Sequence, residues 1–187
     1  MNEVFLKSML ALLGGLSSIL PAQSAPPAKP PPPGCDTPQS HQWDFWVGKW
    51  EVRPRGDDKI IAHSLIEKKY AGCAIRETWM PLGRETGGGG SLSIYDRRLK
   101  KWRQTWVDSA GSRVQLDGGF ANGVMTITGL WRDFGGPGKD AVVSMMYQLQ
   151  PDGEVRQWAK ASADGGKTWQ PSFDFLYRPV ADLPPSK

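Results

Sequence analysis

The chain has 187 residues, a formal net charge of +4 and 39% hydrophobic residues, a balance that fits one compact domain with tails. Apart from an N-terminal apolar run, no stretch could span a membrane, which excludes a protein with several membrane-spanning helices. The 22 glycines and 16 prolines predict many turns. Nine tryptophans are the outlier, and in a β-rich chain they favour a packed aromatic core, a ligand cavity, or both.

Residues 1–24 have the pattern of a secretory signal peptide, with cleavage predicted after Ser24. Lys7 supplies the positive charge, and the apolar run from Met9 to Leu20 is too short for a comfortable membrane span. The protein is therefore expected to be exported, to a periplasm or as a secreted protein. Residues 25–34 are predicted to be a proline-rich linker, residues 35–180 a single domain, and residues 181–187 a short tail.

Cys35 and Cys73 are the only cysteines in the chain. Because export to an oxidising compartment permits disulfides, a bridge between them is the favoured interpretation. Two free thiols, or a reactive or metal-binding pair, are the alternatives. A bridge would tie the N-terminal segment to the end of an early strand.

The domain is expected to begin with a helical turn and to continue as a series of short strands. Asp36-Thr37-Pro38 is a helix-start signal for a short helix or single turn that carries Trp43 and Trp46, and Gly48 ends it. Turn signals such as Asn122-Gly123 separate the strands that follow. We expect about ten strands, over residues 47–53, 57–70, 74–80, 91–95, 102–108, 112–120, 124–131, 141–149, 155–162 and 168–178. An antiparallel meander of this kind hides its edges by closing or stacking, so the predicted fold is all-β, a barrel or a sandwich.

The hairpin within residues 87–108 is the best-specified part of the chain, and the glycine-rich loop 81–90 before it is expected at a barrel mouth. Side chains alternate faces along a strand, so Trp102, Gln104, Trp106 and Asp108 share one face. An aromatic, amide, aromatic and carboxylate series suits a half-polar cavity better than a plain apolar core. We take this face to point inward; a one-residue change of register would reverse it.

Several segments carry a resemblance to known proteins. Gly48-Lys49-Trp50 has the Gly-x-Trp form that opens the first strand of lipocalins and related calycin barrels, in which an arginine near the last strand packs over the tryptophan. A cation–π contact between Trp50 and Arg178 is therefore a hypothesis. Taken together, residues 35–36, 45–50, 72–73, 77–79, 91–96, 102–108, 162–169 and 177–178 resemble the DUF1579-like group of exported bacterial proteins of uncharacterised function. The resemblance covers nearly all of residues 35–178, implies a calycin-like β-barrel, and carries over no catalytic residues.

Two motifs are interpreted as structural. Residues 162–169, SADGGKTW, match the Asp-box, a hairpin device in which Asp and Ser bond the turn backbone and Trp packs beneath. The basic residues within 97–103 surround Trp102, as in some nucleic-acid sites, but they lie on a predicted hairpin turn. We interpret them as a solvated turn, with an anionic envelope or phosphate partner as the alternative, and predict no nucleic-acid partner.

Candidate chemistry is limited to a few side chains. His41 and His63 are the only histidines, and neither belongs to a cluster with ligand spacing, so no metal site and no cofactor are predicted. Glu77, Asp108 and Asp133 are candidates for acid–base work. The alternative is that these carboxylates orient a ligand or bond tryptophan, arginine or loop amides.

These patterns favour an exported calycin-like barrel that binds a small, partly apolar ligand in its lumen. The expected apolar walls are Trp79, Tyr95 and Trp106, and the expected polar groups are Glu77, Gln104 and Asp108. Gln157 and Trp158 lie on opposite faces of one strand, so at most one of them points inward. A cofactor-free isomerase, cyclase or hydrolase that uses Glu77 or Asp108 is the second hypothesis, and a structural protein with a filled barrel is the third. The sequence leaves the ligand and the oligomeric state open.

Overall fold

The computed structural model of the protein describes residues 35–83 and 87–183. The signal peptide and linker expected over residues 1–34, and the last four residues of the expected tail, lie outside this range. The expected domain, residues 35–180, falls within it except for residues 84–86.

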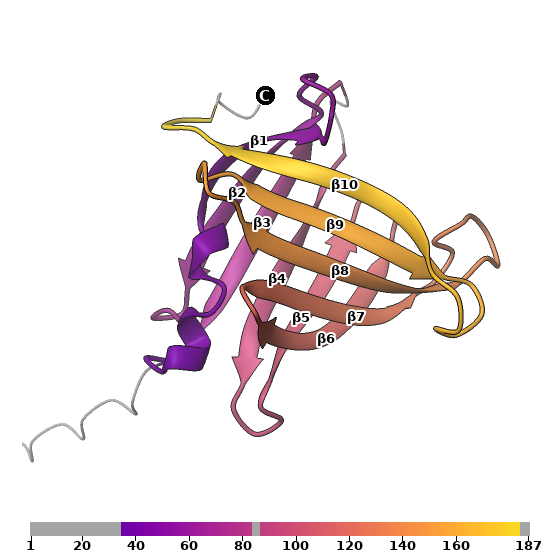
Figure 1. Ribbon diagram of the computed structural model, residues 1–187, viewed down its shortest axis with the longest axis horizontal. Helices are drawn as coiled ribbons and strands as arrows, with labels where there is room; N and C mark the ends of the chain where they lie inside the picture. Colours follow the sequence, from indigo (N-terminus) through magenta and orange to yellow (C-terminus); the bar gives the residue numbers. More distant parts are fainter. Residues whose placement is uncertain (1–34, 84–86, 184–187) are drawn as a thin grey trace, which may run out of the picture. The chain divides into compact units, whose positions relative to one another are not determined.

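Ten antiparallel strands close into a barrel, as the turn spacing predicts. Each strand pairs with its neighbour in the chain, and the last strand pairs with the first, so that β10 lies between β1 and β9 (Figure 1). This closure leaves no free edge in the sheet that the described residues form. The strands are β1 (Gly48–Pro54), β2 (Ala62–Lys69), β3 (Ala74–Pro81), β4 (Gly89–Asp96), β5 (Lys101–Asp108), β6 (Arg113–Ala121), β7 (Val124–Trp131), β8 (Ala141–Leu149), β9 (Val155–Ser162) and β10 (Gln170–Pro179).

Turn chemistry sets where the hairpins fold back. Asn122 and Gly123 both have positive φ, 50° and 78°, which is the backbone twist that joins β6 to β7 through a two-residue loop. Gly153 has φ 86° in the turn between β8 and β9. The second strand is shorter than the predicted 57–70, because residues 57–61 lie outside the ladder that pairs β2 with β1.

Two glycines on β6 and β7 let the backbones of these two strands approach closely. A Cβ atom on Gly118 would lie 1.8 Å from the carbonyl oxygen of Thr126, and one on Gly129 would lie 2.0 Å from that of Gln115. The backbones of the two strands therefore approach so closely at these points that only glycine fits.

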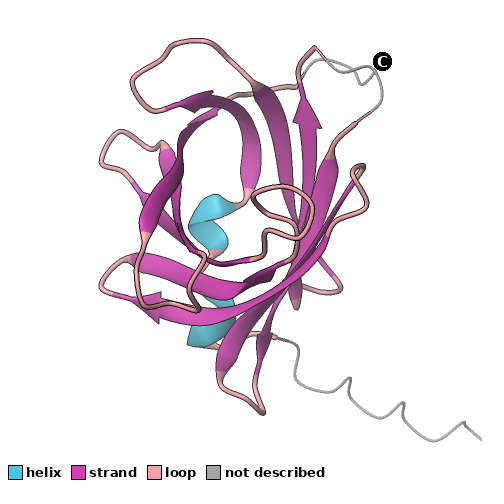
Figure 2. Ribbon diagram, turned by 90° about the vertical axis from the view of Figure 1, so that its right-hand side faces the viewer, coloured by secondary structure: helices cyan, strands magenta, loops and turns pink. Residues whose placement is uncertain are grey.

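A segment before the first strand closes one end of the barrel. Thr37 caps the first turn with a capping box and Pro38 opens it, as the helix-start signal predicts. The segment forms two short 3-10 helices, η1 (Pro38–His41) and η2 (Asp44–Trp46), in place of one helix. Figure 2 shows a helical turn inside the ring of strands. No helix within residues 35–83 and 87–183 is long and apolar enough to cross a membrane.

Aromatic side chains fill this closed end. Trp43 and Trp46 are fully buried and stack on each other with ring centroids 5.2 Å apart. Trp43 also meets the edges of Trp102 at 5.4 Å and Tyr147 at 4.9 Å. Because such pairs add to the burial of large apolar surface, this end of the barrel is a packed aromatic core.

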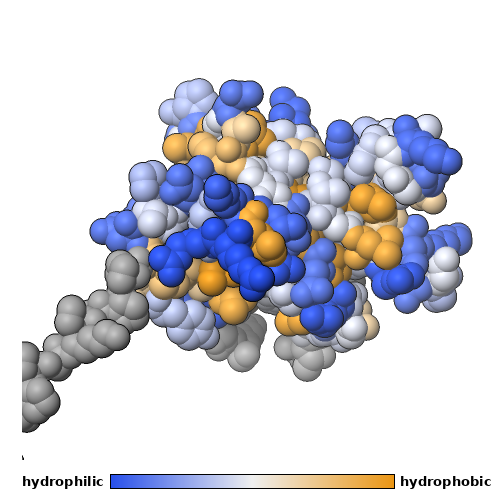
Figure 3. Space-filling view, turned by 90° about the horizontal axis from the view of Figure 1, so that it is seen from below, coloured by the Kyte–Doolittle hydropathy of each residue, from blue (hydrophilic) through white to orange (hydrophobic). Residues whose placement is uncertain are grey.

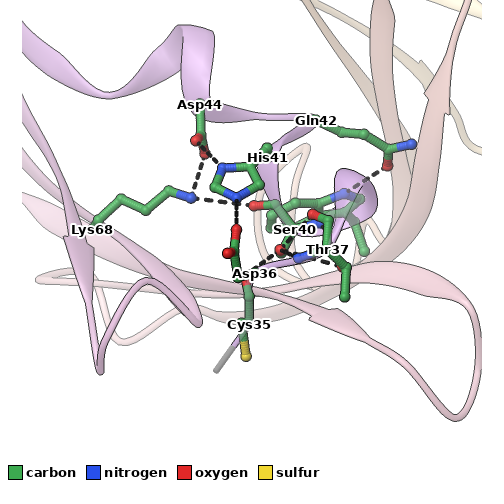
Figure 4. A network of polar contacts seen from close by, with 9 residues as sticks. Cys35, Asp36, Thr37, Ser40, His41, Gln42, Asp44 and Lys68 are labelled. Atoms are coloured by element: carbon green, nitrogen blue, oxygen red, sulfur yellow. Dashed lines mark hydrogen bonds and ion pairs between the residues drawn. The ribbon is translucent and has the colours of Figure 1, made fainter. Parts of the chain in front are cut away.

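A disulfide and an ion-pair network link the segment that contains η1 and η2 to the barrel wall. Cys35 and Cys73 are bridged, which confirms the favoured pairing. Figure 4 shows His41 between Asp36 and Asp44, at 3.0 Å and 2.7 Å, while Lys68 from β2 reaches Asp44 at 2.5 Å. Both links tie the segment to the region around β2 and β3.

The hypothesised contact between Trp50 and Arg178 does not form. The ring of Trp50 packs inside the barrel against Gly48, and its indole N–H donates to the Trp46 carbonyl at 3.0 Å. Arg178 lies directly opposite Glu51 in the β1–β10 ladder and pairs with it on the outer face. Adjacent residues of a strand face opposite sides, so Trp50 and Arg178 are separated by the sheet.

Candidate functional site

The lumen holds a cavity of about 140 Å³ towards the end opposite η1 and η2. The inner side chains at the closed end are fully buried, whereas the tryptophan and phenylalanine side chains that line the cavity are half-buried. The third hypothesis, a completely filled barrel, therefore describes only the closed end.

Aromatic rings form the walls of the cavity. Trp79 and Trp106 line it, as predicted from the alternation of β3 and β5, and Trp131, Phe173 and Phe175 complete the wall. These last three were not among the predicted site residues, although the alternation of β7 and β10 carries the signal. Trp79 stacks on Phe175 at 6.2 Å, and Phe175 on Phe173 at 4.9 Å. The cavity wall is thus made of aromatic rings that pack on one another.

Small inner-face residues on β4 make room for larger side chains on its neighbours. Ser91 lies directly opposite Glu77 of β3 and directly opposite Trp106 of β5. A Cβ atom on Gly89 would lie 2.6 Å from the ring of Trp106, so glycine is required there for the ring to keep its position. The inner face of β4 thus gives these two side chains the space they need.

Glu77 is the carboxyl group of the cavity, and it is 5% exposed. The Ser64 hydroxyl donates to one of its oxygens at 3.3 Å and the Ser91 hydroxyl donates to the other at 2.9 Å. Burial raises the pKa of Glu77 to about 7, and the two hydroxyl hydrogen bonds oppose this change only in part. A carboxyl group that titrates near neutral pH in an aromatic cavity marks a candidate functional site.

Gln104 fixes the direction of the bond from Ser91. Its amide nitrogen donates to the hydroxyls of Ser91 at 3.2 Å and of Ser93 at 3.1 Å. Because the Ser91 oxygen accepts from Gln104, its own hydrogen is free to point at Glu77. Gln104 was predicted to bind ligand, and it lines the cavity while orienting this chain of hydrogen bonds.

A second polar chain runs along the cavity wall over the neighbouring strands β8, β9 and β10. The Tyr177 hydroxyl donates to the Gln157 side-chain oxygen at 2.6 Å, and the Gln157 amide nitrogen donates to the Tyr147 hydroxyl at 2.9 Å. Burial, and then the nearby charge of Glu77, raise the pKa of both tyrosines well above the usual 10, so both stay protonated. Of the two residues left open on β9, Gln157 points inward, and Trp158 lies outside with Arg156 4.5 Å above its ring.

Two of the predicted site residues lie away from the cavity. Asp108 sits at the end of β5, where it accepts hydrogen bonds from the Trp106 indole at 3.0 Å and from the backbone amides of Ala110 and Ser112. Burial by itself would raise the pKa of Asp108, but these hydrogen bonds outweigh it and hold the pKa below its usual value. Asp108 therefore acts as a turn-former that positions Trp106. Tyr95 lies towards the closed end, 6.1 Å from Trp102.

The Asp-box forms the turn between β9 and β10. Asp164 accepts from the Ser162 and Thr168 hydroxyls and from the backbone amides of Lys167 and Thr168. The Trp169 indole donates to the Gly166 carbonyl at 3.1 Å. With its oxygens occupied in this way, Asp164 stabilises the turn, which agrees with the structural interpretation.

Asp133, Lys101 and Arg103 each have a partner outside the cavity. Asp133 accepts a 2.6 Å bond from the Gly138 amide within its loop. Lys101 and Arg103 of the basic stretch pair with Asp117, at 2.7 Å and 3.0 Å. Within residues 35–83 and 87–183, no group of three or more His, Cys, Asp or Glu side chains is arranged to hold a metal ion.

The outer surface offers weaker candidates than the lumen. A hollow of about 530 Å³ lies beside the disulfide, lined by the charged side chains of the closing network, which already pair with each other. Figure 3 shows a face on which hydrophilic residues surround separate small apolar patches. Scattered apolar residues of this kind are normal on protein surfaces.

Comparison with known proteins does not assign a function to this cavity. No family model matches the chain, and no curated protein matches its sequence. The resemblance to the DUF1579-like group stays a prediction, and the function is inferred from the site alone.

Proposed function

We propose that the protein binds a compact, partly apolar small molecule in the open part of its lumen. The observation that carries the proposal is a cavity of about 140 Å³ in which aromatic walls surround one buried carboxyl group, Glu77. Apolar walls with a few convergent polar groups are typical of small-ligand sites.

The size of the cavity limits the ligand. A cavity of about 150 Å³ lined by apolar side chains accommodates benzene. The ligand of this protein is therefore expected to enter the lumen with a part about the size of one ring, such as a single-ring compound or the head of a longer molecule. Any longer part would extend out of the cavity towards solvent.

The protein is also proposed to work outside the cytoplasm. The predicted signal peptide at residues 1–24 and the Cys35–Cys73 disulfide support this, since disulfides persist mainly in oxidising compartments. A ligand carrier or sensor in a periplasm or in the medium fits these features.

Native mass spectrometry of the protein purified gently from its own host tests the binding proposal. We expect an extra mass that is lost on denaturation, is retained in Trp158→Ala and is absent from Trp106→Ala. The two variants remove the same side chain from the outer face and from the cavity, respectively. If all three proteins carried no extra mass and one-ring probes such as benzyl alcohol did not bind, the proposal would be overturned.

A cofactor-free enzyme is the second candidate, because Glu77 titrates near neutral pH, where a carboxyl group can both accept and donate a proton. The Tyr147–Gln157–Tyr177 chain would then orient the substrate. An enzyme of this kind would convert the ligand found by mass spectrometry, and Glu77→Gln would bind it without turnover. Equal turnover in Glu77→Gln and the wild type would contradict the enzyme hypothesis.

A further inference from the structure

The cavity contains negative charge and no positive counterpart among the described residues. Glu77 is its only carboxyl group, and no lysine, arginine or histidine within residues 35–83 and 87–183 lines it. An anionic ligand would bring a second negative charge beside a buried carboxylate, where the low dielectric strengthens repulsion. The charge of the site therefore disfavours carboxylates and phosphates as ligands.

The hydrogen bonds around Glu77 are arranged for its ionised form. Both oxygens accept from serine hydroxyls, at 3.3 Å from Ser64 and 2.9 Å from Ser91. Gln104 donates to Ser91 at 3.2 Å and so keeps the Ser91 hydrogen directed at the carboxylate. Burial opposes ionisation, and the structure provides no buried cation to offset that cost within the described residues.

The aromatic walls of the cavity would also attract a cation, in addition to the charge of Glu77. Trp79, Trp106 and Trp131 line the cavity together with Phe175. The faces of aromatic rings attract ammonium groups, most strongly where water is excluded, and tryptophan is the best partner. An ammonium group at Glu77 would thus lie in a cavity that aromatic rings and one carboxylate line.

We propose, building on the ligand-binding function above, that the ligand is a compact organic cation. Its ammonium group would pair with the Glu77 carboxylate, and its apolar part would lie between the tryptophan rings. The titratable groups that face Glu77 from the other strands are Tyr147 and Tyr177, and both stay protonated at neutral pH. Glu77 is therefore the group that sets how binding depends on pH.

Three probes of equal size and different charge test this inference. Isothermal titration calorimetry at pH 8 and pH 6 measures the binding of benzylammonium, benzyl alcohol and benzoate. The protein is the whole chain as it is purified from its host. We expect benzylammonium to bind about tenfold more tightly than benzyl alcohol at pH 8. Its affinity should fall about tenfold at pH 6, where most Glu77 is protonated, while that of benzyl alcohol should change little.

Two further readouts tie the preference to Glu77. At pH 7 the binding of benzylammonium should release about half a proton, measured by calorimetry in two buffers of different ionisation enthalpy. This measurement needs no variant. In Glu77→Gln the preference for benzylammonium should disappear, and in Glu67→Gln, which changes a carboxylate on the outer face of β2, it should remain.

The outcomes separate the cation inference from the binding proposal. Benzyl alcohol or benzoate binding as tightly as benzylammonium at pH 8 would overturn the inference and leave the binding proposal standing. A preference for benzylammonium without proton release, or one that persists in Glu77→Gln, would also overturn it. Failure of all three probes to bind would contradict the proposed binding function itself.

Discussion

Replacing Glu77 with glutamine should stabilise the protein at alkaline pH. In the unfolded chain this carboxyl group has a pKa near 4.5, and in the fold its pKa is about 7. Between these values the folded state holds a proton that the unfolded state has lost, so stability falls as pH rises through this window. At 1.36 kcal/mol per pKa unit, the loss above pH 7 amounts to about 3 kcal/mol. Glutamine keeps the shape of the side chain and never ionises.

The assay is urea unfolding of the wild type and Glu77→Gln from pH 4 to pH 8.5. Since every other titrating group is shared, the difference between their unfolding free energies isolates Glu77. We expect the variant to gain about 3 kcal/mol relative to the wild type between pH 4 and pH 8. Glu67→Gln is the control. Hydrogen bonds from Lys69 and Arg76 hold the pKa of Glu67 below its usual value. The Glu67→Gln variant should therefore lose unfolding free energy relative to the wild type as the pH rises, the opposite of Glu77→Gln. If the difference in unfolding free energy between the wild type and Glu77→Gln stays constant from pH 4 to pH 8.5, the reasoning is refuted.

Two other perturbations test the elements that hold the site. The disulfide closes a loop of 38 residues. A Cys35→Ser, Cys73→Ser double variant should therefore lose about 4 kcal/mol of unfolding free energy. A loss below about 1 kcal/mol would contradict the stabilising role of the disulfide. Gly118→Ala should lose about 3 kcal/mol or more in the same assay, because its Cβ atom would collide with the Thr126 carbonyl oxygen. Gly119→Ala is the matched control, since a Cβ atom there meets nothing within 4 Å and should cost about 1 kcal/mol or less. Equal losses in the two glycine variants would argue against a close approach of β6 and β7.

Local signals in the sequence were sufficient to predict that there are ten strands, although the second was predicted too long. The bounds of β7, β8 and β9 coincide with the predicted ranges, because strong turn residues such as Asn122-Gly123 flank them. The helix start was also predicted correctly, from the cap at Thr37 and the proline after it. The split into two 3-10 helices was not, since packing of Trp43 and Trp46 inside the barrel decides it.

Strand alternation predicts which residues share a face of the barrel wall, and this much of the site could be predicted from the sequence. Alternation put Glu77 with Trp79 on one face of β3, and Gln104 with Trp106 on one face of β5. That these faces point inward was assumed, and the structure has all four residues at the cavity. Alternation could not tell how far along the lumen a residue lies, so Tyr95 was assigned to the cavity although it packs near Trp102. Nor could alternation show that Asp108 bonds the turn after β5, because two of its partners there are the backbone amides of Ala110 and Ser112.

Binding in the lumen can be located directly through the tryptophan indole signals in a ¹H–¹⁵N NMR spectrum. The chain has nine tryptophans, of which Trp79, Trp106 and Trp131 line the cavity and Trp158 lies on the outer face. With benzylammonium added at pH 8, we expect the three cavity signals to move together while that of Trp158 stays in place. A spectrum in which Trp158 moves and the three cavity signals do not would place binding outside the barrel and contradict the proposed function.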